Sequence, residues 1–460
     1  MVFSSTIFLF IFLPVCLFFN FIVDKKFKNL VLLIFSLIFY AWGEPKNVIL
    51  MLFSILFNYF FGILVEKDNK YIKKSSLILA CVYNLGVLFV FKYLNFSIDT
   101  FNELFNQNIE IAKIALPIGI SFYTFQNLSY VIDVYRGNVK AQRKFLDLAL
   151  YVSLFPQLIA GPIVRYINIQ KQIINRVSSI KRVREGLVRF QVGFIKKVLI
   201  ADVLSGLVDI AFRGEYPSIY TNWIGAIAYA LQIYFDFSGY SDMAIGIGRI
   251  LGFKFLENFN YPYISRSIQE FWRRWHISLS SWFKDYVYIP LGGSREGNFK
   301  TYRNIFIVFL LCGTWHGASF NFIFWGVYYA LFLMFERAIG KSLLEKLPLI
   351  FRHFYAILVV LVGWVFFRAD TMIDAVKYLK GMVTFQGKDL ANFNFIMNGE
   401  YYLFLIVGIL CSMPHTKIKN FFKKTIFRIC ISDFLTLLIF LVAISYMVGK
   451  GHSPFLYFRF

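Results

Sequence analysis

The feature that most constrains this chain is a series of apolar stretches, each long enough to cross the hydrocarbon core of a membrane, that runs from one end to the other. Of the 460 residues, 58% are apolar and only 16% are charged, against roughly 25% charged residues in soluble domains. A water-soluble fold cannot bury that much apolar surface. The sequence therefore predicts an all-α polytopic membrane protein, one membrane-embedded domain over residues 1–460, with about 11–12 transmembrane helices of ~20 residues each.

The basic residues are distributed as in a membrane protein. The formal net charge of +22 would by itself also suit a protein that binds nucleic acid. Here Lys and Arg stand in short clusters between the apolar stretches, which is the positive-inside pattern, so no nucleic-acid partner is expected. The five cysteines show no C-x-x-C spacing and lie mostly inside apolar stretches. Neither a disulfide framework nor a metal site is expected.

The order of the charged loops predicts the orientation. The first apolar stretch, residues 2–23, has no basic segment before it and no clear cleavage site after it, so we expect a retained first span. Basic loops then alternate with neutral or acidic ones, which places the N-terminus outside the cytoplasm. Counting crossings to the other end places the C-terminal tail, residues 449–460, outside as well.

Two segments are expected to enter the membrane without crossing it. Residues 145–164 are interrupted by Pro156, Gly161 and Pro162, and basic residues flank both ends. A full crossing would not allow such flanks, so a re-entrant or horizontal element on the cytoplasmic side is predicted. Residues 260–292, rich in aromatic and basic side chains, are expected to form a second element of this kind.

A histidine stands inside one of the predicted spans. His316 follows the start of its apolar run, near Arg303, by enough residues to lie ~20 Å deep in a helix. Ionisable groups at such depth usually face the interior of a bundle or a wet cavity and are candidates for function. The alternative is a buried histidine that only hydrogen-bonds neighbouring helices. Gly313 and Gly317, which flank Trp315 and His316, indicate close backbone approach or a break and favour a lined cavity.

The segment 260–292 contains a second histidine among interleaved aromatic and basic residues. On a helix, His276 and Trp272 share one face. One interpretation is an interfacial amphipathic helix with snorkelling arginines. The other is an element that binds an anionic acyl donor, with Arg273 and Arg274 contacting phosphate and the rings stacking.

Two carboxylates fall within or at the end of another predicted span. Asp236 and Asp242 stand among tyrosines and serines, and either could orient a histidine or pair with an arginine. The alternative is that this segment serves helix packing through its small residues, Gly239, Ala244, Gly246 and Gly248.

These residues lie in motifs that resemble the membrane-bound O-acyltransferase superfamily, in particular the bacterial branch that O-acetylates alginate, peptidoglycan and related exopolysaccharides. The resemblance runs nearly end to end. Its motifs here are VFSSTIFLFIFLP, LIFYAWGEP, LPIGISFYTFQNLSYVIDVYRG, LFPQLIAGPIVRY, YFDFSGYSDMAIGIGRILGF, FWRRWHISLSSWFKDYVYIPLGG and GTWHGASFNFIFWG.

The resemblance implies a funnel-shaped membrane fold in the bacterial cytoplasmic (inner) membrane, where a cytoplasmic donor meets an extracytoplasmic acceptor. It implies that His316, in the W-H-G motif after Trp315, is catalytic, and that His276 is the preceding polar position of the family. The expected donor is acetyl-CoA, with His316 as general base on the acceptor hydroxyl. Asp236 is expected to line the substrate site.

The C-terminal sequence SPFLYFRF resembles an aromatic terminal motif of related acyl-transfer systems, in which a tyrosine carries the acyl group to a partner enzyme. Tyr457 is then a candidate relay that passes acetyl to an extracytoplasmic acetyltransferase partner. The alternative is an aromatic residue that anchors the tail at the membrane interface.

Several functions stay open at this point. The residue usage suggests an AT-rich genome, which favours peptidoglycan over alginate as the glycan, and teichoic acid D-alanylation is a further relative. A transporter or flippase of a lipid-linked sugar would use the same cavity without covalent chemistry, although no internal repeat is found. A scaffold that only recruits a secreted acetyltransferase would leave His316 dispensable. No P-loop or nucleophile elbow supports ATP-driven pumping or serine hydrolysis.

Overall fold

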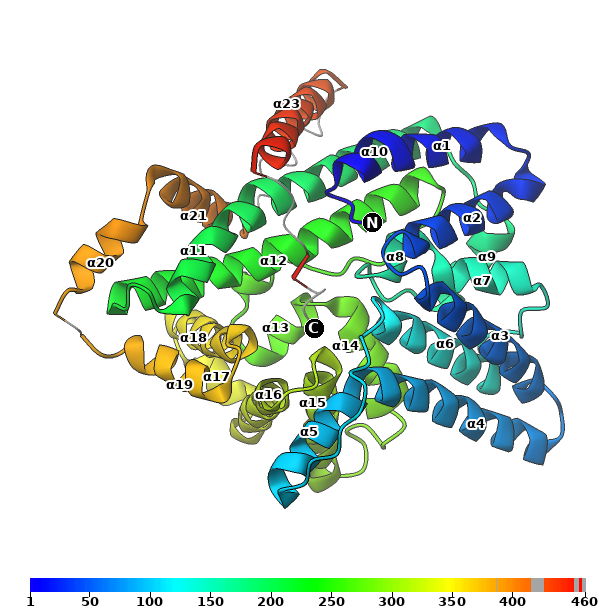
Figure 1. Cartoon of the computed structure of the whole chain (residues 1–460), viewed down its shortest axis with the longest axis horizontal. Helices are drawn as coiled ribbons and strands as arrows, with labels where there is room; N and C mark the ends of the chain where they lie inside the picture. Colours follow the sequence, from blue (N-terminus) through cyan, green and yellow to red (C-terminus); the bar gives the residue numbers. More distant parts are fainter. Residues whose placement is uncertain (386, 415–425, 451–454, 457–460) are drawn as a thin grey trace. The chain divides into compact units, whose positions relative to one another are not determined.

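The computed structural model describes residues 1–385, 387–414, 426–450 and 455–456, and all regular secondary structure in these ranges is helical (Figure 1). The prediction of an all-α protein is therefore confirmed. The chain forms two compact units, one made of residues 1–190 and 243–256 and the other of residues 191–242 and 257–460. Each unit is described by itself below.

The first unit is built from the N-terminal helices and contributes none of the candidate site residues. Its helices are α1 (Leu13–Ile22), α2 (Lys28–Ala41), α3 (Asn47–Val65), α4 (Lys70–Leu88), α5 (Leu94–Phe105), α6 (Ile120–Tyr135), α7 (Phe145–Ser153), α8 (Phe155–Leu158), α9 (Tyr166–Ile174), most of α10 (Ile180–Ile195) and the last part of α12 (Ile219–Ile250), from Met243 on.

The second unit contains all of the candidate site residues that the structure describes. It begins at the end of α10 and continues through a π-helical turn (Lys196–Ala201). Its further helices are α11 (Asp202–Arg213), α12 (Ile219–Ile250, up to Asp242), α13 (Ile268–Arg274), α14 (Ile277–Phe283), α15 (Asn298–His316), α16 (Phe320–Ile339), α17 (Lys341–Lys346), α18 (Leu349–Arg368), α19 (Met372–Gly381), α20 (Asp389–Ile396), α21 (Gly399–Cys411) and α23 (Ile426–Lys450).

Five helical segments in the described ranges are long and apolar enough to cross a membrane, and the bent pair α20–α21, with 88° between its halves, would make a sixth. The chain is therefore a multi-pass membrane protein. The five segments are Asn47–Val65, Lys70–Phe105, Phe320–Ile339, Leu349–Arg368 and Ile429–Gly449.

This number is smaller than the 11–12 crossings expected from the sequence because several of the apolar stretches form short or polar helices. The first stretch is helical only over Phe8–Ile22, which at 1.5 Å per residue is shorter than ~30 Å of hydrocarbon. The long helix α12 carries Asp236 and Asp242 in its interior. Hydropathy alone does not distinguish such helices from full spans.

The two segments that were expected not to cross are broken in the structure. Within 145–164, α7 ends at Ser153 and α8 begins two residues later, at Phe155, with Pro156 in its first turn, where proline is tolerated. Residues 260–292 form the seven-residue helices α13 and α14 and a π-helical turn, Lys284–Tyr288. Helices this short cannot span a bilayer.

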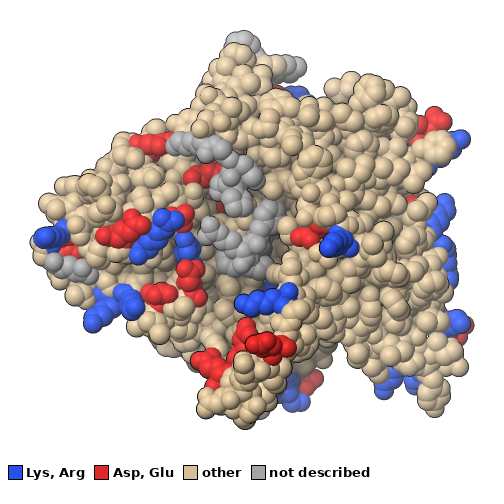
Figure 2. All heavy atoms as spheres, in the orientation of Figure 1, with Lys and Arg blue, Asp and Glu red and all other residues tan. Residues whose placement is uncertain are grey.

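The surface in Figure 2 is mostly uncharged, and Lys, Arg, Asp and Glu appear in a few separate groups. This agrees with the membrane assignment, since a surface that faces lipid is apolar. On α23, for example, only 6% of the most apolar window is buried inside the protein.

Candidate active site

His316 is the last residue of α15, at the point where the chain turns into α16. The helix ends because Gly317 takes an extended conformation (φ −170°, ψ 155°). Helices α15 and α16 lie side by side (Figure 1), and a Cβ on Gly313 would lie 2.3 Å from the carbonyl oxygen of Phe322. Both effects expected of Gly313 and Gly317, close approach and a break, are therefore present.

The imidazole of His316 is 5% exposed and lies among aromatic rings from three helices. Its ring centroid is 4.9 Å from that of Trp315, 5.1 Å from that of Trp325 on α16 and 5.1 Å from that of Phe367 on α18, with nearly perpendicular planes. These contacts fix the orientation of the ring. They also exclude bulk water, which strengthens electrostatic interactions at the ring.

His276 does not share a helical face with Trp272, so that part of the sequence prediction is wrong. Helix α13 ends at Arg274, and His276 adopts a left-handed backbone conformation (φ 43°, ψ 55°) before α14 starts. This conformation is uncommon for a residue other than glycine and is found preferentially where the surroundings impose it. The break turns the imidazole into the interior, where it is 1% exposed.

Asn258 fixes the proton of His276. Its Oδ1 accepts hydrogen bonds from the Ser278 backbone N–H (3.2 Å) and hydroxyl (2.9 Å), and lies 3.0 Å from Nδ1 of His276. A backbone N–H can only donate, so the Asn258 atom is its carbonyl oxygen, which can only accept. The His276 proton is therefore on Nδ1, and Nε2 is the ring nitrogen with a lone pair.

Burial lowers the pKa of His276 to about 3. The cause is the loss of hydration, which disfavours the charged imidazolium. His276 is therefore neutral at physiological pH. It is too weak a base to compete for a substrate proton, but its Nε2 can accept a hydrogen bond.

Trp315 connects the two histidines. Its ring centroid is 6.2 Å from that of His276 and 4.9 Å from that of His316. Elements that are far apart in the sequence, the α13–α14 junction and the end of α15, thus meet at one tryptophan. The structure brings together His316, His276 and Trp315, as expected of one site.

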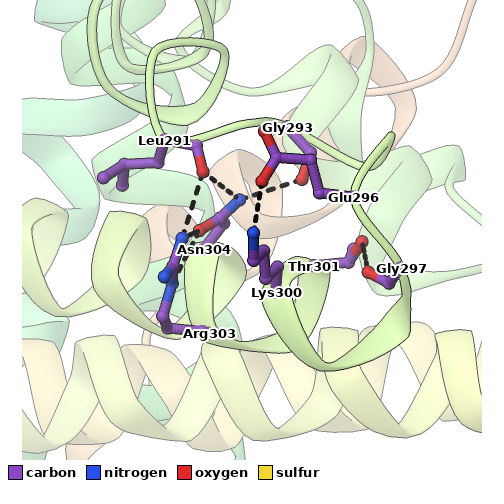
Figure 3. Close-up of polar contacts among 8 residues, drawn as sticks. All are labelled: Leu291, Gly293, Glu296, Gly297, Lys300, Thr301, Arg303 and Asn304. Carbon is purple, nitrogen blue, oxygen red and sulfur yellow. Dashed lines mark hydrogen bonds and ion pairs between the residues drawn. The ribbon is translucent and has the colours of Figure 1, made fainter.

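Helix α15 is fixed at its other end by the loop that precedes it (Figure 3). Asn304 is fully buried, and its Nδ2 donates to the carbonyl oxygens of Leu291 (3.1 Å) and Gly293 (2.9 Å). Arg303 also donates to the Leu291 carbonyl (3.1 Å). The loop therefore closes on the helix that carries His316.

Asp236 and Asp242 pair with lysines, where histidine or arginine was expected. Asp236 Oδ1 lies 2.7 Å from Lys197 Nζ, and Asp242 Oδ2 lies 2.7 Å from Lys196 Nζ. Gly239, which lies between the two aspartates in the sequence, serves close helix packing, the alternative considered for this segment. A Cβ on Gly239 would lie 2.7 Å from the Gly193 carbonyl oxygen.

The described part of the C-terminal tail lies against α12. Phe455 packs on Phe237 and Tyr240, with ring centroids 6.0 and 4.9 Å away, and the Leu456 N–H donates to Asp236 Oδ2 over 2.9 Å. Phe237 in turn contacts the His276 ring (4.6 Å). Tyr457, the candidate relay, lies outside the described residues.

The other candidate residues occupy different environments. Trp272 is buried against Trp325 and Tyr329, with centroid distances of 5.5 and 4.9 Å. Arg274 is held by Glu270 (2.9 Å) and by the Asn260 carbonyl (3.0 Å). Arg273 is exposed. Of the two arginines proposed to bind an anionic donor, Arg273 is the one with an exposed side chain.

Sequence reasoning missed three residues that organise the site. Asn258 gave no signal, because an asparagine between apolar segments is usually a turn residue. Lys196 and Lys197 did give one, since two adjacent charges inside a predicted span call for buried partners. The aspartates on α12 are those partners.

The model of the membrane-bound O-acyltransferase family matches residues 142–369. This range contains His276, His316 and Asp236 but not the C-terminal tail.

Two relatives match over most of the chain, and a third matches over about half of it. The "Probable alginate O-acetylase AlgI" of Pseudomonas aeruginosa is 46% identical over 400 residues, 86% of this chain and 77% of its own length. The peptidoglycan O-acetyltransferase of Helicobacter pylori is 38% identical over 85% of this chain and 81% of its own length. The teichoic acid D-alanyltransferase of Bacillus subtilis is 30% identical over 47% of this chain and 58% of its own length.

Proposed function

Because the chain belongs to the membrane-bound O-acyltransferase family, and is a multi-pass O-acetyltransferase of that family, we propose that it passes acetyl groups from cytoplasmic acetyl-CoA to an extracytoplasmic glycan. The observation that carries the proposal is the meeting of His316 and His276 at Trp315, inside a buried aromatic cluster.

His316 is the general base in this proposal. It takes the proton of the acceptor hydroxyl while that oxygen attacks the carbonyl carbon of the thioester. The C–O bond forms, the C–S bond breaks, and the thiolate of coenzyme A leaves and recovers the proton. Support comes from the ring contacts of His316, which hold the imidazole in one orientation in a site that excludes bulk water.

His276 positions the reacting groups. Its proton is committed to Asn258 and its pKa is lowered to about 3, so Nε2 accepts a hydrogen bond without removing the proton. A hydroxyl or an amide of the acetyl donor is a suitable partner.

The donor is the thioester of coenzyme A, reached from the cytoplasmic side. Arg273, on α13 three residues before His276, has an exposed side chain and would contact the phosphates. Arg274, with its bonds to Glu270 and Asn260, holds α13 in place.

Tyr457 carries the acetyl group to a partner enzyme outside the cytoplasm. A tyrosine hydroxyl is a weak nucleophile while it is protonated, so it needs a base such as His316. Support comes from the two residues before it, Phe455 and Leu456, which are buried in the unit that holds both histidines. The partner then moves the acetyl group to a sugar hydroxyl.

The glycan is a polymer outside the cytoplasmic membrane. Similarity to an alginate O-acetylase and to a peptidoglycan O-acetyltransferase supports this class. The preference for peptidoglycan that residue usage suggested stays a prediction. It is tested by offering both polymers together with the partner.

The proposal is tested by incubating the purified protein with acetyl-CoA labelled in its acetyl group and mapping the label on peptides. We expect an acetyl ester on Tyr457 in the wild type, and none in Tyr457→Phe, which keeps the ring but lacks the nucleophile, or in His316→Ala.

Label that persists in Tyr457→Phe would exclude the relay and leave the acyltransferase. Absence of label and of glycan acetylation in every sample, with partner and glycan supplied, would favour the transport of a lipid-linked sugar.

A further inference from the structure

The tail contact at Asp236 involves a buried ion pair. The side chains of Lys197 and Asp236 are 4% and 2% exposed, and Nζ lies 2.7 Å from Oδ1. Lys197 also lies 2.6 Å from Asp202 Oδ1. Burying such a pair is costly, and it persists only when further hydrogen bonds satisfy the remaining polar atoms.

The second carboxylate oxygen of Asp236 accepts a hydrogen bond from the C-terminal segment. Oδ2 accepts the backbone N–H of Leu456 over 2.9 Å, a charge-assisted hydrogen bond to a residue 220 positions away in the sequence. Because the donor is a main-chain amide, this hydrogen bond fixes the position of the backbone at residue 456. It does not depend on the identity of the side chain there.

An aromatic contact lies beside this hydrogen bond. Phe455 is 1% exposed and packs on Phe237 and Tyr240, the residues that flank Asp236 and Gly239 on α12. Phe237 also packs edge-on against the His276 ring at 4.6 Å. The tail and the buried histidine therefore contact the same phenyl ring.

The local backbone brings Lys197 close to α12. The lysine lies in the π-helical turn Lys196–Ala201, a type of turn that is frequent at functional sites. Gly239 allows α12 to lie close to the segment that contains Gly193 and Lys197. A Cβ on Gly239 would lie 2.7 Å from the Gly193 carbonyl oxygen and 3.1 Å from the backbone nitrogen of Lys197.

We propose that the Lys197–Asp236 pair, with Phe237 and Tyr240, is a docking site for the C-terminal segment of this chain, and that Asp236 is a positioning residue that seats the tail beside His276. The consequence for catalysis rests on the proposed function: a seated tail delivers its tyrosine hydroxyl to the histidines, and an unseated tail does not.

Docking is tested by the reactivity of a cysteine placed in the tail. Leu456→Cys keeps the backbone N–H, and the five native cysteines are replaced so that maleimide reports on position 456 alone. With Asp236 present, the buried thiol reacts slowly. With Asp236→Ala, we expect labelling about 10- to 100-fold faster, the range for loss of a hydrogen bond to a charged group.

Asp242→Ala is the matched control. It removes a carboxylate from the same helix that pairs with Lys196, and labelling of position 456 is expected to stay within about twofold of the reference. If Asp236→Ala fails to fold, the double variant Lys197→Met, Asp236→Leu replaces the ion pair by apolar side chains of similar size. Unchanged labelling in the folded variant that lacks Asp236 would overturn the docking site.

The amide itself is tested without touching the ion pair. Leu456→Pro removes the N–H donor, whereas Leu456→Ala keeps it. We expect acetyl transfer to fall at least tenfold in Leu456→Pro and in Asp236→Ala, and less than threefold in Leu456→Ala. Equal transfer by Leu456→Pro and Leu456→Ala would contradict the positioning role.

The two measurements separate this proposal from the proposed function. Cysteine labelling reports on the tail whether or not acetyl is transferred. Faster labelling with unchanged transfer would uphold the docking site while removing the relay.

Discussion

At the scale of single residues, the site depends on how two histidines are held. His316 is packed against the rings of Trp315, Trp325 and Phe367. His276 has a backbone in the left-handed region, and its Nδ1 donates to the Oδ1 of Asn258. A strained conformation of about 1–3 kcal/mol persists only where the surroundings over-determine it. Here the Asn258–Ser278 network supplies that support.

The buried, neutral state of His276 predicts a pH dependence of stability. Because burial lowers its pKa to about 3, the unfolded chain binds a proton below about pH 6.5 that the folded chain does not. The stability that His276 contributes is complete above pH 6.5 and is lost as the pH falls toward 3. We expect the thermal midpoint in detergent to fall more steeply between pH 7 and pH 5 in the wild type than in His276→Asn. Parallel curves would show that His276 titrates normally in the folded protein.

The sequence singled out candidate site residues but did not predict the groups that they contact. Both histidines and Asp236 stand out because polar groups in apolar surroundings are rare. The partners of Asp236, a lysine 39 positions earlier and an amide 220 positions later, come from tertiary packing. No local periodicity reports such contacts.

At the scale of elements, α15 is fixed at both ends. The loop from Leu291 to Gly293 closes on Asn304 near its start, and Gly313 packs on α16 near its end. Contacts at both ends of α15 therefore fix the position of His316. The buried hydrogen bonds add directional contacts to the apolar packing, which alone would allow the helix to shift along its axis.

The loop contact predicts a sharp effect of a small substitution. Asn304→Asp replaces a donor amide by a carboxylate that faces two carbonyl oxygens. The Gly293 carbonyl oxygen loses its Asn304 donor, the Leu291 carbonyl oxygen keeps the hydrogen bond from Arg303, and both face a negative charge. We expect a loss of roughly 2–4 kcal/mol in stability, measured as a lower thermal midpoint.

The matched control is Asn298→Asp, the same substitution at an exposed position in the first turn of α15. An acid is favourable there because of the helix dipole, so the midpoint should stay within about 1 °C or rise. Equal effects of the two substitutions would contradict the anchoring role of Asn304.

Element boundaries show the limit of the sequence prediction. The breaks near Pro156 and Gly317 were predictable because proline and glycine mark them. The break at His276 was not, because the segment around it has no glycine or proline and its spacing fits one helix. The ring contacts and the Asn258 network compensate for that local preference.

At the scale of the whole molecule, composition sufficed to predict a helical membrane protein, and the motifs sufficed to predict the family. The number of membrane spans was harder to predict from the sequence, because helices such as α12 are long and largely apolar but also carry buried charged residues. The family model ends at residue 369, and the docking of the tail on α12 lies partly beyond it. The contact at Asp236 is a feature that the motifs do not report.

The measurement that tests the central claim most directly is the rate of acetyl transfer from labelled acetyl-CoA by His316→Ala beside His353→Ala, with folding checked by the thermal midpoint. His353 is a half-buried histidine on α18, with Nδ1 3.1 Å from the Ser265 carbonyl oxygen, and serves as the matched control. We expect transfer to fall at least about 100-fold in His316→Ala, as for loss of a general base, and less than threefold in His353→Ala. Undiminished transfer by His316→Ala would contradict the account.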